Sequence, residues 1–320
     1  MSDHKYSLGI DIGGTNTVFG LVAASGQIIK KDSILTNSSK APDLLFENIF
    51  NKIKVWEKEL GIPDIIKDIG VGVPNGNYFT GMVVSPPNLG KGWDELNLVA
   101  LIKSYKNIPV AITNDANAAA LGEKYYGVAK SMNDVVVITL GTGLGSGILV
   151  NNNILYGHDG FAGELGHLVI EPKGRDCGCG RKGCLEMYVS AKGLDYTVRE
   201  YRNEYPDNKF LQRINSQTVN GKLFDNAFDD GEKIVIDIYK YTGQMLGLGL
   251  AQIAKILSPE AFVFYGGLSN AKNRILDFAK ESMNANRSKY QKNKIKILLS
   301  ELSDGEAGIL GASCLHMLNQ

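Results

Sequence analysis

Two glycine-rich turns, each lying between two apolar segments, constrain the fold of this chain more than any other feature of its sequence. The first turn follows Asp11 in D-I-G-G-T-N-T-V-F-G-L-V, and the second follows Leu140 in L-G-T-G-L-G-S-G-I-L-V, about 130 residues further on. A short apolar strand that enters such a turn and leaves it as another strand predicts a β-hairpin. The repetition indicates an imperfect internal duplication, with a chance match as the alternative because glycine turns between strands are common.

The length of 320 residues predicts two domains, each large enough for its own core. Helical spacing of apolar residues and short apolar runs predict helices and strands that alternate along the chain, which is typical of an α/β architecture. The expected helices span 42–60, 115–125, 190–205, 232–257 and 306–318, and the expected strands span 6–11, 17–23, 27–34, 69–73, 110–113, 134–140, 146–150, 261–265 and 295–299. Glycines inside the helix at 232–257 predict close packing against a neighbouring element.

Charge and hydropathy exclude several classes of function. Lys and Arg together number 34, and Asp and Glu also number 34, whereas a surface that binds nucleic acid needs a basic excess. The sequence has no run of about 18 apolar residues that would span a membrane, and no apolar segment of a secretion signal near its start. We therefore expect a cytoplasmic protein that binds neither nucleic acid nor a membrane.

The first glycine turn has the composition of an anion-binding site. Asp11 ends a predicted strand, and Gly13, Gly14 and Thr15 follow it. Backbone N–H groups in such a turn can point at a phosphate, and the glycines leave room for its approach. The threonine can donate to a phosphate oxygen, and the acid can hold Mg²⁺ directly or through water. A plain hairpin turn explains the same residues equally well.

The second turn, which contains Thr142 and Gly143, is too dense in glycine for a simple hairpin. Its glycines fall at every second position before a strand, unlike the dinucleotide-binding fingerprint, and the chain contains no G-K-[ST] sequence of a Walker A loop. Two phosphate turns in separate halves favour a nucleotide bound in a cleft between domains. Gly266 and Gly267, which follow another predicted strand, offer a third point of close approach for the nucleoside.

Asn114 and Asp115 lie at a predicted strand-to-helix junction. Capping of the helix by Asp115 accounts fully for an acid at this place. The same position also suits a catalytic base, because the helix dipole keeps the carboxylate ionised and a substrate hydroxyl could transfer its proton to it. Both interpretations are open at this point.

Three of the four cysteines, Cys177, Cys179 and Cys184, fall within eight residues, and His167 precedes the first of them by ten. Three thiolates and an imidazole form a closed set that is typical of structural zinc, without the open position that a water-activating zinc needs. Disulfides are typical of secreted chains, so zinc explains the cluster better than a disulfide or a redox pair. We expect the isolated Cys314 to be an ordinary core residue.

Several polar side chains near this cluster and near Asp115 suit recognition of a polyol. Glu164, His167 and Glu186 surround the cysteines, and Asn88 and Asn114 lie earlier in the chain. Carboxylate, amide and imidazole groups can pair with neighbouring hydroxyls, and a zinc-bound imidazole keeps one nitrogen free for a ligand. Ordinary surface charge is the alternative for the two glutamates.

The motifs D-I-G-G-T-N, T-N-D-A-N-A-A-A-L-G-E, L-G-T-G-L-G-S-G and G-F-A-G-E-L-G-H followed by C-G-C-G-R-K-G-C-L-E resemble, in this order, the ROK family of sugar kinases and repressors. The resemblance covers nearly the whole chain. It implies a two-domain ATPase fold of the actin/hexokinase (ribonuclease H-like) type, with ATP and a sugar in the cleft between domains. It also implies a first domain of residues 1–115, completed by a C-terminal helix at about 303–320, and a larger second domain of residues 116–302 that carries the zinc loop.

The same resemblance implies an ATP-dependent hexose kinase, most similar to glucokinases that make glucose 6-phosphate, with Asp115 as the catalytic base. The motif positions imply sugar contacts by Gly76, Asn88, Asn114, Asp115, Glu164, His167 and Glu186, and structural zinc ligands in His167, Cys177, Cys179 and Cys184. They imply nucleotide and Mg²⁺ contacts by Asp11, Gly13, Gly14, Thr15, Thr142, Gly143 and Gly267. The segment V-P-N-G-N-Y-F-T-G around Gly76 departs from the family's usual G-x-P-G form.

Two alternatives to a glucokinase follow from the same resemblance, which also implies a homodimer. N-acetylglucosamine, N-acetylmannosamine, mannose and fructose differ from glucose by one substituent or by ring form, so a few contacts decide among them. Other members of the family are sugar-responsive repressors. Those members carry a DNA-binding helix-turn-helix before the first glycine turn, which in this chain begins at Asp11, so we expect a kinase.

Overall fold

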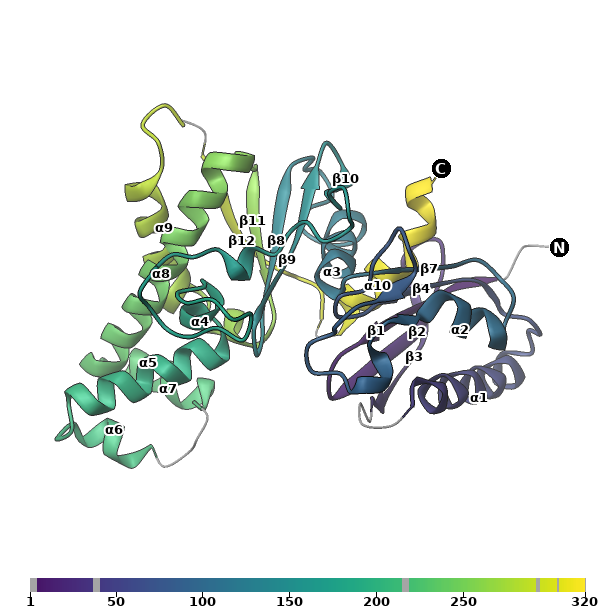
Figure 1. Cartoon of the computed structure of the whole chain (residues 1–320), viewed down its shortest axis with the longest axis horizontal. Coiled ribbons are helices and arrows are strands. Elements are labelled where there is room, and N and C mark those ends of the chain that lie inside the picture. The colour runs from purple at the N-terminus through teal and green to yellow at the C-terminus, as the bar shows by residue number, and fades with distance from the viewer. Residues whose placement is uncertain (1–4, 37–40, 215–218, 292–293, 304, 320) are drawn as a thin grey trace. The chain divides into compact units, whose positions relative to one another are not determined.

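The computed structural model describes residues 5–36, 41–214, 219–291, 294–303 and 305–319 (Figure 1). Its first main sheet has the strand order β3-β2-β1-β4-β7. The strands are β1 (Tyr6–Ile12), β2 (Asn16–Val22), β3 (Ile28–Leu35), β4 (Ile66–Gly72) and β7 (Val110–Thr113). β1 pairs antiparallel with β2 and parallel with β4, and β4 pairs parallel with β7.

The second main sheet repeats this order. Its strands are β8 (Val135–Leu140), β9 (Leu144–Val150), β10 (Asn153–Ile154), β11 (Ala261–Tyr265) and β12 (Lys296–Leu299). They lie in the order β10-β9-β8-β11-β12, so each sheet reads third, second, first, fourth, fifth along the chain. β11 is parallel to β8 and to β12, as β4 is to β1 and β7. The repeated topology confirms the internal duplication that the two glycine turns indicate.

The helices agree with the sequence in part. They are α1 (Pro42–Leu60), α2 (Leu98–Tyr105), α3 (Asp115–Tyr125), α4 (Glu186–Val189), α5 (Ala191–Glu204), α6 (Lys209–Arg213), α7 (Gly221–Asp229), α8 (Lys233–Leu257), α9 (Asn273–Asn286) and α10 (Glu306–Ser313). α1 and α3 have the expected bounds, whereas the expected last helix ends at Ser313 and a 3₁₀ turn, η4 (Leu315–Asn319), follows it. The sequence did not predict α2, α4, α6, α7 or α9. In the part of the chain described, no helix is long and apolar enough to cross a membrane.

The chain forms two compact units. The first comprises Met1–Asn133, Gly147–Gly163 and Ser300–Gln320, and the second comprises Asp134–Ser146 and Glu164–Leu299. The first boundary differs from the division expected at residue 115, because α3 packs against α10 and β4 of the first unit. A two-stranded pair, β5 (Met82–Val83) with β6 (Leu96–Asn97), also belongs to the first unit.

In the first unit, the alternation of β1 decides which helix covers which face of the sheet. Leu8 and Ile10 are fully buried in one apolar cluster with Phe46 of α1. Successive side chains of a strand point to opposite faces. Gly9 and Asp11 therefore face the other way, where α10 packs against β1 and β4.

In the second unit, α8 and α9 pack closely along their lengths. A Cβ added at Gly243 of α8 would lie 2.6 Å from the carbonyl oxygen of Ile275, and one at Gly247 would lie 2.4 Å from that of Ala279. Both oxygens belong to α9. Two of the three glycines inside this long helix thus meet a neighbouring backbone, and the third, Gly249, packs against the Leu185 side chain, as the predicted close packing requires.

Candidate active site

Asp11 and Asp115 come together at one edge of the first sheet. β1, β4 and β7 are parallel, so their carboxyl ends share that edge. Asp11 is the next-to-last residue of β1, and Asp115 begins α3 directly after β7. A Cβ added at Gly72, the last residue of β4, would lie 3.5 Å from the Cα of Asp115 and 3.7 Å from Oδ1 of Asp11. Ligands of open α/β sheets bind at such an edge.

The two carboxyl groups affect each other. Burial, and after it the charge of Asp115, raise the pKa of Asp11 from 3.8 to about 7. A cation beside this carboxyl would favour its ionised form and reverse part of the shift. Carboxylate oxygen is the donor that Mg²⁺ prefers, so the Asp11 side chain fits the metal that the sequence predicts for it.

Asn114, rather than Asp115, caps α3. Its Oδ1 accepts a hydrogen bond of 2.9 Å from the N–H of Ala116. Asp115 is the first residue of the helix, and its own Oδ1 also accepts from that N–H at 2.9 Å. The helix therefore has its cap without Asp115, and its N-terminus favours the ionised form of the Asp115 carboxyl.

The first glycine turn is held from one side by two threonines. The Gly13 N–H donates to the carbonyl oxygen of Asn16 at 3.0 Å, which closes the turn between β1 and β2. The Thr36 hydroxyl donates to the carbonyl oxygen of Gly13 at 2.7 Å and pairs with the Thr17 hydroxyl at 2.9 Å. The sequence did not identify either threonine, because a hydroxyl that only supports a turn leaves no motif.

The structure brings the predicted sugar residues of the first unit beside this turn and beside the acid pair. A Cβ added at Gly14 would lie 2.9 Å from the Cβ of Asn88, so Asn88 touches the predicted phosphate turn. A Cβ added at Gly76 would lie 2.7 Å from the carbonyl oxygen of Thr113, which immediately precedes Asn114. The predicted residues of the first unit are thus in one place: Asp11, Gly13, Gly14, Thr15, Gly76, Asn88, Asn114 and Asp115.

Gly308 is a further residue of this site that the sequence analysis missed. It lies in the first turn of α10, and a Cβ added to it would be 2.4 Å from Oδ2 of Asp11. Any larger residue would therefore displace the carboxyl group. Glycine inside a helix costs about 1 kcal/mol relative to alanine. A glycine three residues into a predicted helix was thus the available signal of a close contact.

The second unit gathers the four predicted zinc ligands. One ligand atom from each of His167, Cys177, Cys179 and Cys184 lies within 4.8 Å of all the others. The Sγ atoms of Cys179 and Cys184 are 3.6 Å apart, and Sγ of Cys177 is 3.6 Å from Nδ1 of His167. A tetrahedral zinc ion with Zn–S of about 2.3 Å and Zn–N of about 2.0 Å needs separations of about 3.8 and 3.5 Å. The residues therefore fit zinc, and the thiols are free rather than joined.

Arg175 holds the predicted zinc loop, residues 167–184, onto the helices that follow it. Its guanidinium donates to the carbonyl oxygens of Met187 and Gly193 at 2.7 and 3.0 Å, and it lies over the ring of Tyr188. It also forms a two-pronged ion pair with Glu200. The loop, α4 and α5 are thereby joined by one side chain. A charged residue in a loop gave no such indication in the sequence.

Glu186 and Glu164 lie on either side of the zinc ligands. Oε1 of Glu186 accepts from the Cys177 thiol at 3.2 Å and is 3.7 Å from Nδ1 of His167. Nε2, the other nitrogen of His167, is 4.0 Å from Oε2 of Glu164. With Nδ1 directed at the thiols, Nε2 is the nitrogen left for a ligand or for Glu164. Both glutamates thus lie beside the four predicted zinc ligands in the structure.

The second glycine turn lies beside the Gly266–Gly267 pair. Within the turn, the Gly141 N–H donates to the carbonyl oxygen of Gly143 at 3.0 Å, and Thr142 is exposed at the tip of the turn. Gly266 has a φ of 101°, and a Cβ added to it would lie 2.7 Å from the carbonyl oxygen of Leu140. The predicted nucleotide residues Thr142, Gly143 and Gly267 therefore belong to one edge of the second sheet.

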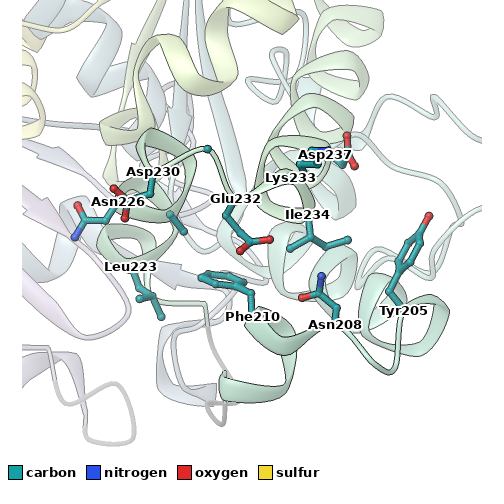
Figure 2. A pocket seen from close by; sticks show the side chains of 12 residues that line it. Tyr205, Asn208, Phe210, Leu223, Asn226, Asp230, Glu232, Lys233, Ile234 and Asp237 are labelled. Carbon is teal, nitrogen blue, oxygen red and sulfur yellow. The ribbon is translucent and has the colours of Figure 1, made fainter.

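A separate pocket of about 800 Å³ lies among the ends of α5, α6 and α7 and the start of α8. Figure 2 shows Phe210, Glu232 and Ile234 near its centre, with Tyr205 at one end and Asn226 toward the other. None of the residues that line it is one of the predicted site residues. The chemistry gathered above thus does not depend on this pocket.

Known proteins resemble the chain over almost its whole length. The glucokinase of Halalkalibacterium halodurans is 31% identical over 320 residues, which cover 98% of this chain and 96% of that protein. The xylose repressor of Caldicellulosiruptor bescii is 29% identical, over 97% of this chain and 77% of that protein. A crystal structure of a ROK family glucokinase from Streptomyces griseus, in complex with glucose and AMPPNP, is similar with a TM-score of 0.79 and 30% identity, covering 97% of this chain and 98% of that one.

These similarities confirm the predicted fold of the actin/hexokinase type, with the repeated sheet seen here. The sequence profile of the ROK family matches residues 7–318. Because that match covers nearly every residue, from β1 through the zinc loop to η4, the chain belongs to the ROK family.

Proposed function

We propose that this protein is an ATP-dependent hexose kinase that converts glucose to glucose 6-phosphate. The observation that carries the proposal is the acid pair Asp11 and Asp115, held beside a glycine turn at the carboxyl ends of β1 and β7. The glucokinase from H. halodurans and the glucose-bound glucokinase from S. griseus support the choice of sugar.

Asp115 acts as the base in this proposal. Its carboxylate accepts the proton of the sugar hydroxyl, whose oxygen forms a bond to the γ-phosphorus of ATP while the bond to the ADP oxygen breaks. The ionised form of Asp115 is the one required, and its place at the start of α3 favours that form. Most of the rate enhancement then comes from holding the reactants in line.

The glycine turns bind the phosphates. Asp11 would hold Mg²⁺, which supplies positive charge to the phosphate oxygens when it is bound. Thr15 and Thr142 would donate to phosphate oxygens, and Gly267 would leave room for the nucleoside. Gly76, Asn88, Asn114, Glu164, His167 and Glu186 would contact the sugar.

His167, Cys177, Cys179 and Cys184 would hold a structural zinc ion. The set has four protein ligands and so supplies no open position for water. Its part in the proposal is to fix the loop that leads into Glu186. Loss of zinc should therefore weaken sugar binding before it affects the chemical step.

The decisive measurement compares ADP release with glucose for the wild type, Asp115→Asn and Asp43→Asn. Asp43 is an exposed acid in the first turn of α1, so it controls for the same substitution at a helix start. We expect Asp115→Asn to lower kcat by at least about a hundredfold with little change in KM, because proton transfer to a base contributes about 10²–10⁴ in rate. Equal rates for the two variants would refute the role of Asp115.

A panel of glucose, mannose, fructose, N-acetylglucosamine and N-acetylmannosamine in the same assay tests the choice of sugar. We expect the highest kcat/KM for glucose, and a higher value for another sugar would redirect the proposal to that sugar. We further propose a cytoplasmic homodimer without affinity for nucleic acid, which sedimentation in the presence and absence of duplex DNA would test.

The similarity to a xylose repressor supports a second candidate, a sugar-responsive DNA-binding protein. The balanced charge of the chain argues against it, since binding to DNA depends on neutralised phosphates. A gel shift that weakens with salt, together with no phosphorylation of any sugar in the panel, would favour this candidate over the kinase.

A further inference from the structure

Leu144 is the first residue of β9 and the middle residue of the second glycine turn, residues 141–147. Its backbone contacts on both sides the residues that we call the predicted sugar loop, 164–167 and 186. Its carbonyl oxygen faces Gly166, where an added Cβ would lie only 2.4 Å from it. Its N–H donates to Oε2 of Glu186 at 3.4 Å. Gly166 lies between Glu164 and His167, so both halves of the predicted sugar loop touch one residue of the predicted nucleotide turn.

Further contacts join the second glycine turn to the sugar loop and its surroundings on either side of Leu144. The Leu165 N–H donates to the Ser146 hydroxyl at 3.4 Å, and the Ala191 N–H donates to the carbonyl oxygen of Gly141 at 3.0 Å. A Cβ added at Gly143 would lie 3.0 Å from Oε2 of Glu186. The turn is therefore held along its length by residues of the sugar loop and of the helix start that follows it.

The contact at Gly166 cannot be relieved by a change of side-chain rotamer. Both partners, the Gly166 Cα and the Leu144 carbonyl group, belong to the backbone. Packed interiors transmit such displacements instead of absorbing them. A larger residue at position 166 must therefore move either the 3₁₀ turn η2 (Leu165–His167) or the glycine turn.

We propose that Gly166 and Leu144 are positioning residues that lock the nucleotide turn to the sugar loop, so that each bound substrate changes the binding free energy of the other. The proposal rests on the proposed function, which assigns these two segments to the two substrates. Linkage requires the effect to be reciprocal: whatever bound sugar does to nucleotide affinity, bound nucleotide does to sugar affinity.

The test is nucleotide binding without any sugar, measured by calorimetry with MgADP. Gly166→Ala lies in the sugar motif, yet it should weaken MgADP binding severalfold, because the added Cβ displaces the Leu144 carbonyl group in the nucleotide turn. Gly178→Ala is the matched control: it lies in the zinc loop, and a Cβ added there meets no atom within 4 Å. It should bind MgADP like the wild type.

The reciprocal test is glucose binding without nucleotide. Gly143→Ala lies in the nucleotide turn, where the added Cβ would press on Glu186, and it should weaken glucose binding severalfold. The melting temperature and zinc content of each variant separate this effect from loss of folding. Wild-type MgADP affinity in a folded Gly166→Ala, or wild-type glucose affinity in a folded Gly143→Ala, would overturn the proposal.

Failure of the proposed function gives a different pattern. If the wild type binds MgADP but does not bind or phosphorylate glucose, the assignment of the sugar is wrong. The MgADP comparison of Gly166→Ala with Gly178→Ala then still tests whether the two segments are locked together. If the wild type binds no MgADP, both the proposed function and the lock are overturned.

Discussion

Replacing Asp11 by asparagine should make the protein more stable when Mg²⁺ is absent, while removing its predicted metal ligand. Burial and the charge of Asp115 raise the pKa of Asp11 from 3.8 to about 7. In the folded protein the carboxyl keeps its proton over a pH range in which the unfolded chain has already lost it. Stability from this group is therefore present below about pH 4 and is lost as the pH rises to about 7.

The rise in the pKa of Asp11 sets the size of the effect on the free energy of unfolding. Each unit of pKa corresponds to about 1.36 kcal/mol, so about three units amount to a loss of about 4 kcal/mol above pH 7. Roughly half of this loss, about 2 kcal/mol, falls between about pH 5 and pH 7. These free energies are upper bounds because the Asp11 side chain is partly exposed to water. For a domain of about 150–250 residues, about 2 kcal/mol corresponds to about 4–8 °C in Tm.

The assay is thermal unfolding of the wild type, Asp11→Asn and the exposed control Asp43→Asn, in buffers without Mg²⁺ at about pH 5 and about pH 8. The advantage of Asp11→Asn over the wild type should be larger at the higher pH, and Asp43→Asn should show no such change. MgADP should then raise the Tm of the wild type more than that of Asp11→Asn. A gain that is equal at both pH values, or absent at pH 8, would refute the argument.

Two further changes test the zinc loop. Cys179→Ser removes one predicted zinc ligand, so the loop that leads into Glu186 is no longer fixed by the metal. We expect a severalfold rise in the KM for glucose together with a lower Tm. An intact protein with an unchanged KM would contradict the link between zinc and sugar. Arg175→Lys keeps the charge but loses Nη1, which donates to both Met187 and Gly193, so we expect a loss of about 1–3 kcal/mol in chemical denaturation. Glu200→Gln is the comparison: it removes the charge of the Glu200 carboxylate, which is 54% exposed, but leaves the bonds to Met187 and Gly193 in place, so we expect a smaller loss.

The sequence predicted those elements whose signals are local. α1 begins at a proline and ends at a glycine in the left-handed conformation, and α3 begins at a capping asparagine. α9 has no such signal: it follows Lys272, whose φ is 52°, and no side-chain hydrogen bond caps it. Rules based on capping residues cannot predict a helix that is held mainly by packing against α8.

The predicted site residues were found for a similar reason. Glycine turns, an acid at a helix start and clustered cysteines each lie within a few residues of one another in the chain. The residues that position them come from far away. Gly308 meets Asp11, and Nη1 of Arg175 meets Met187 and Gly193, only after the chain has folded.

The contact between Gly308 and Asp11 has a consequence for the synthesis of the protein. The strands of the first sheet are complete at Thr113, whereas α10 begins at Glu306, 193 residues later. A ribosome that adds about 5–20 residues per second needs about 10–40 s for that stretch. Throughout this time the face of β1 and β4 that α10 will cover stays bare on the growing chain. The surroundings of Asp11 are thus completed by a helix that the ribosome makes long after β1.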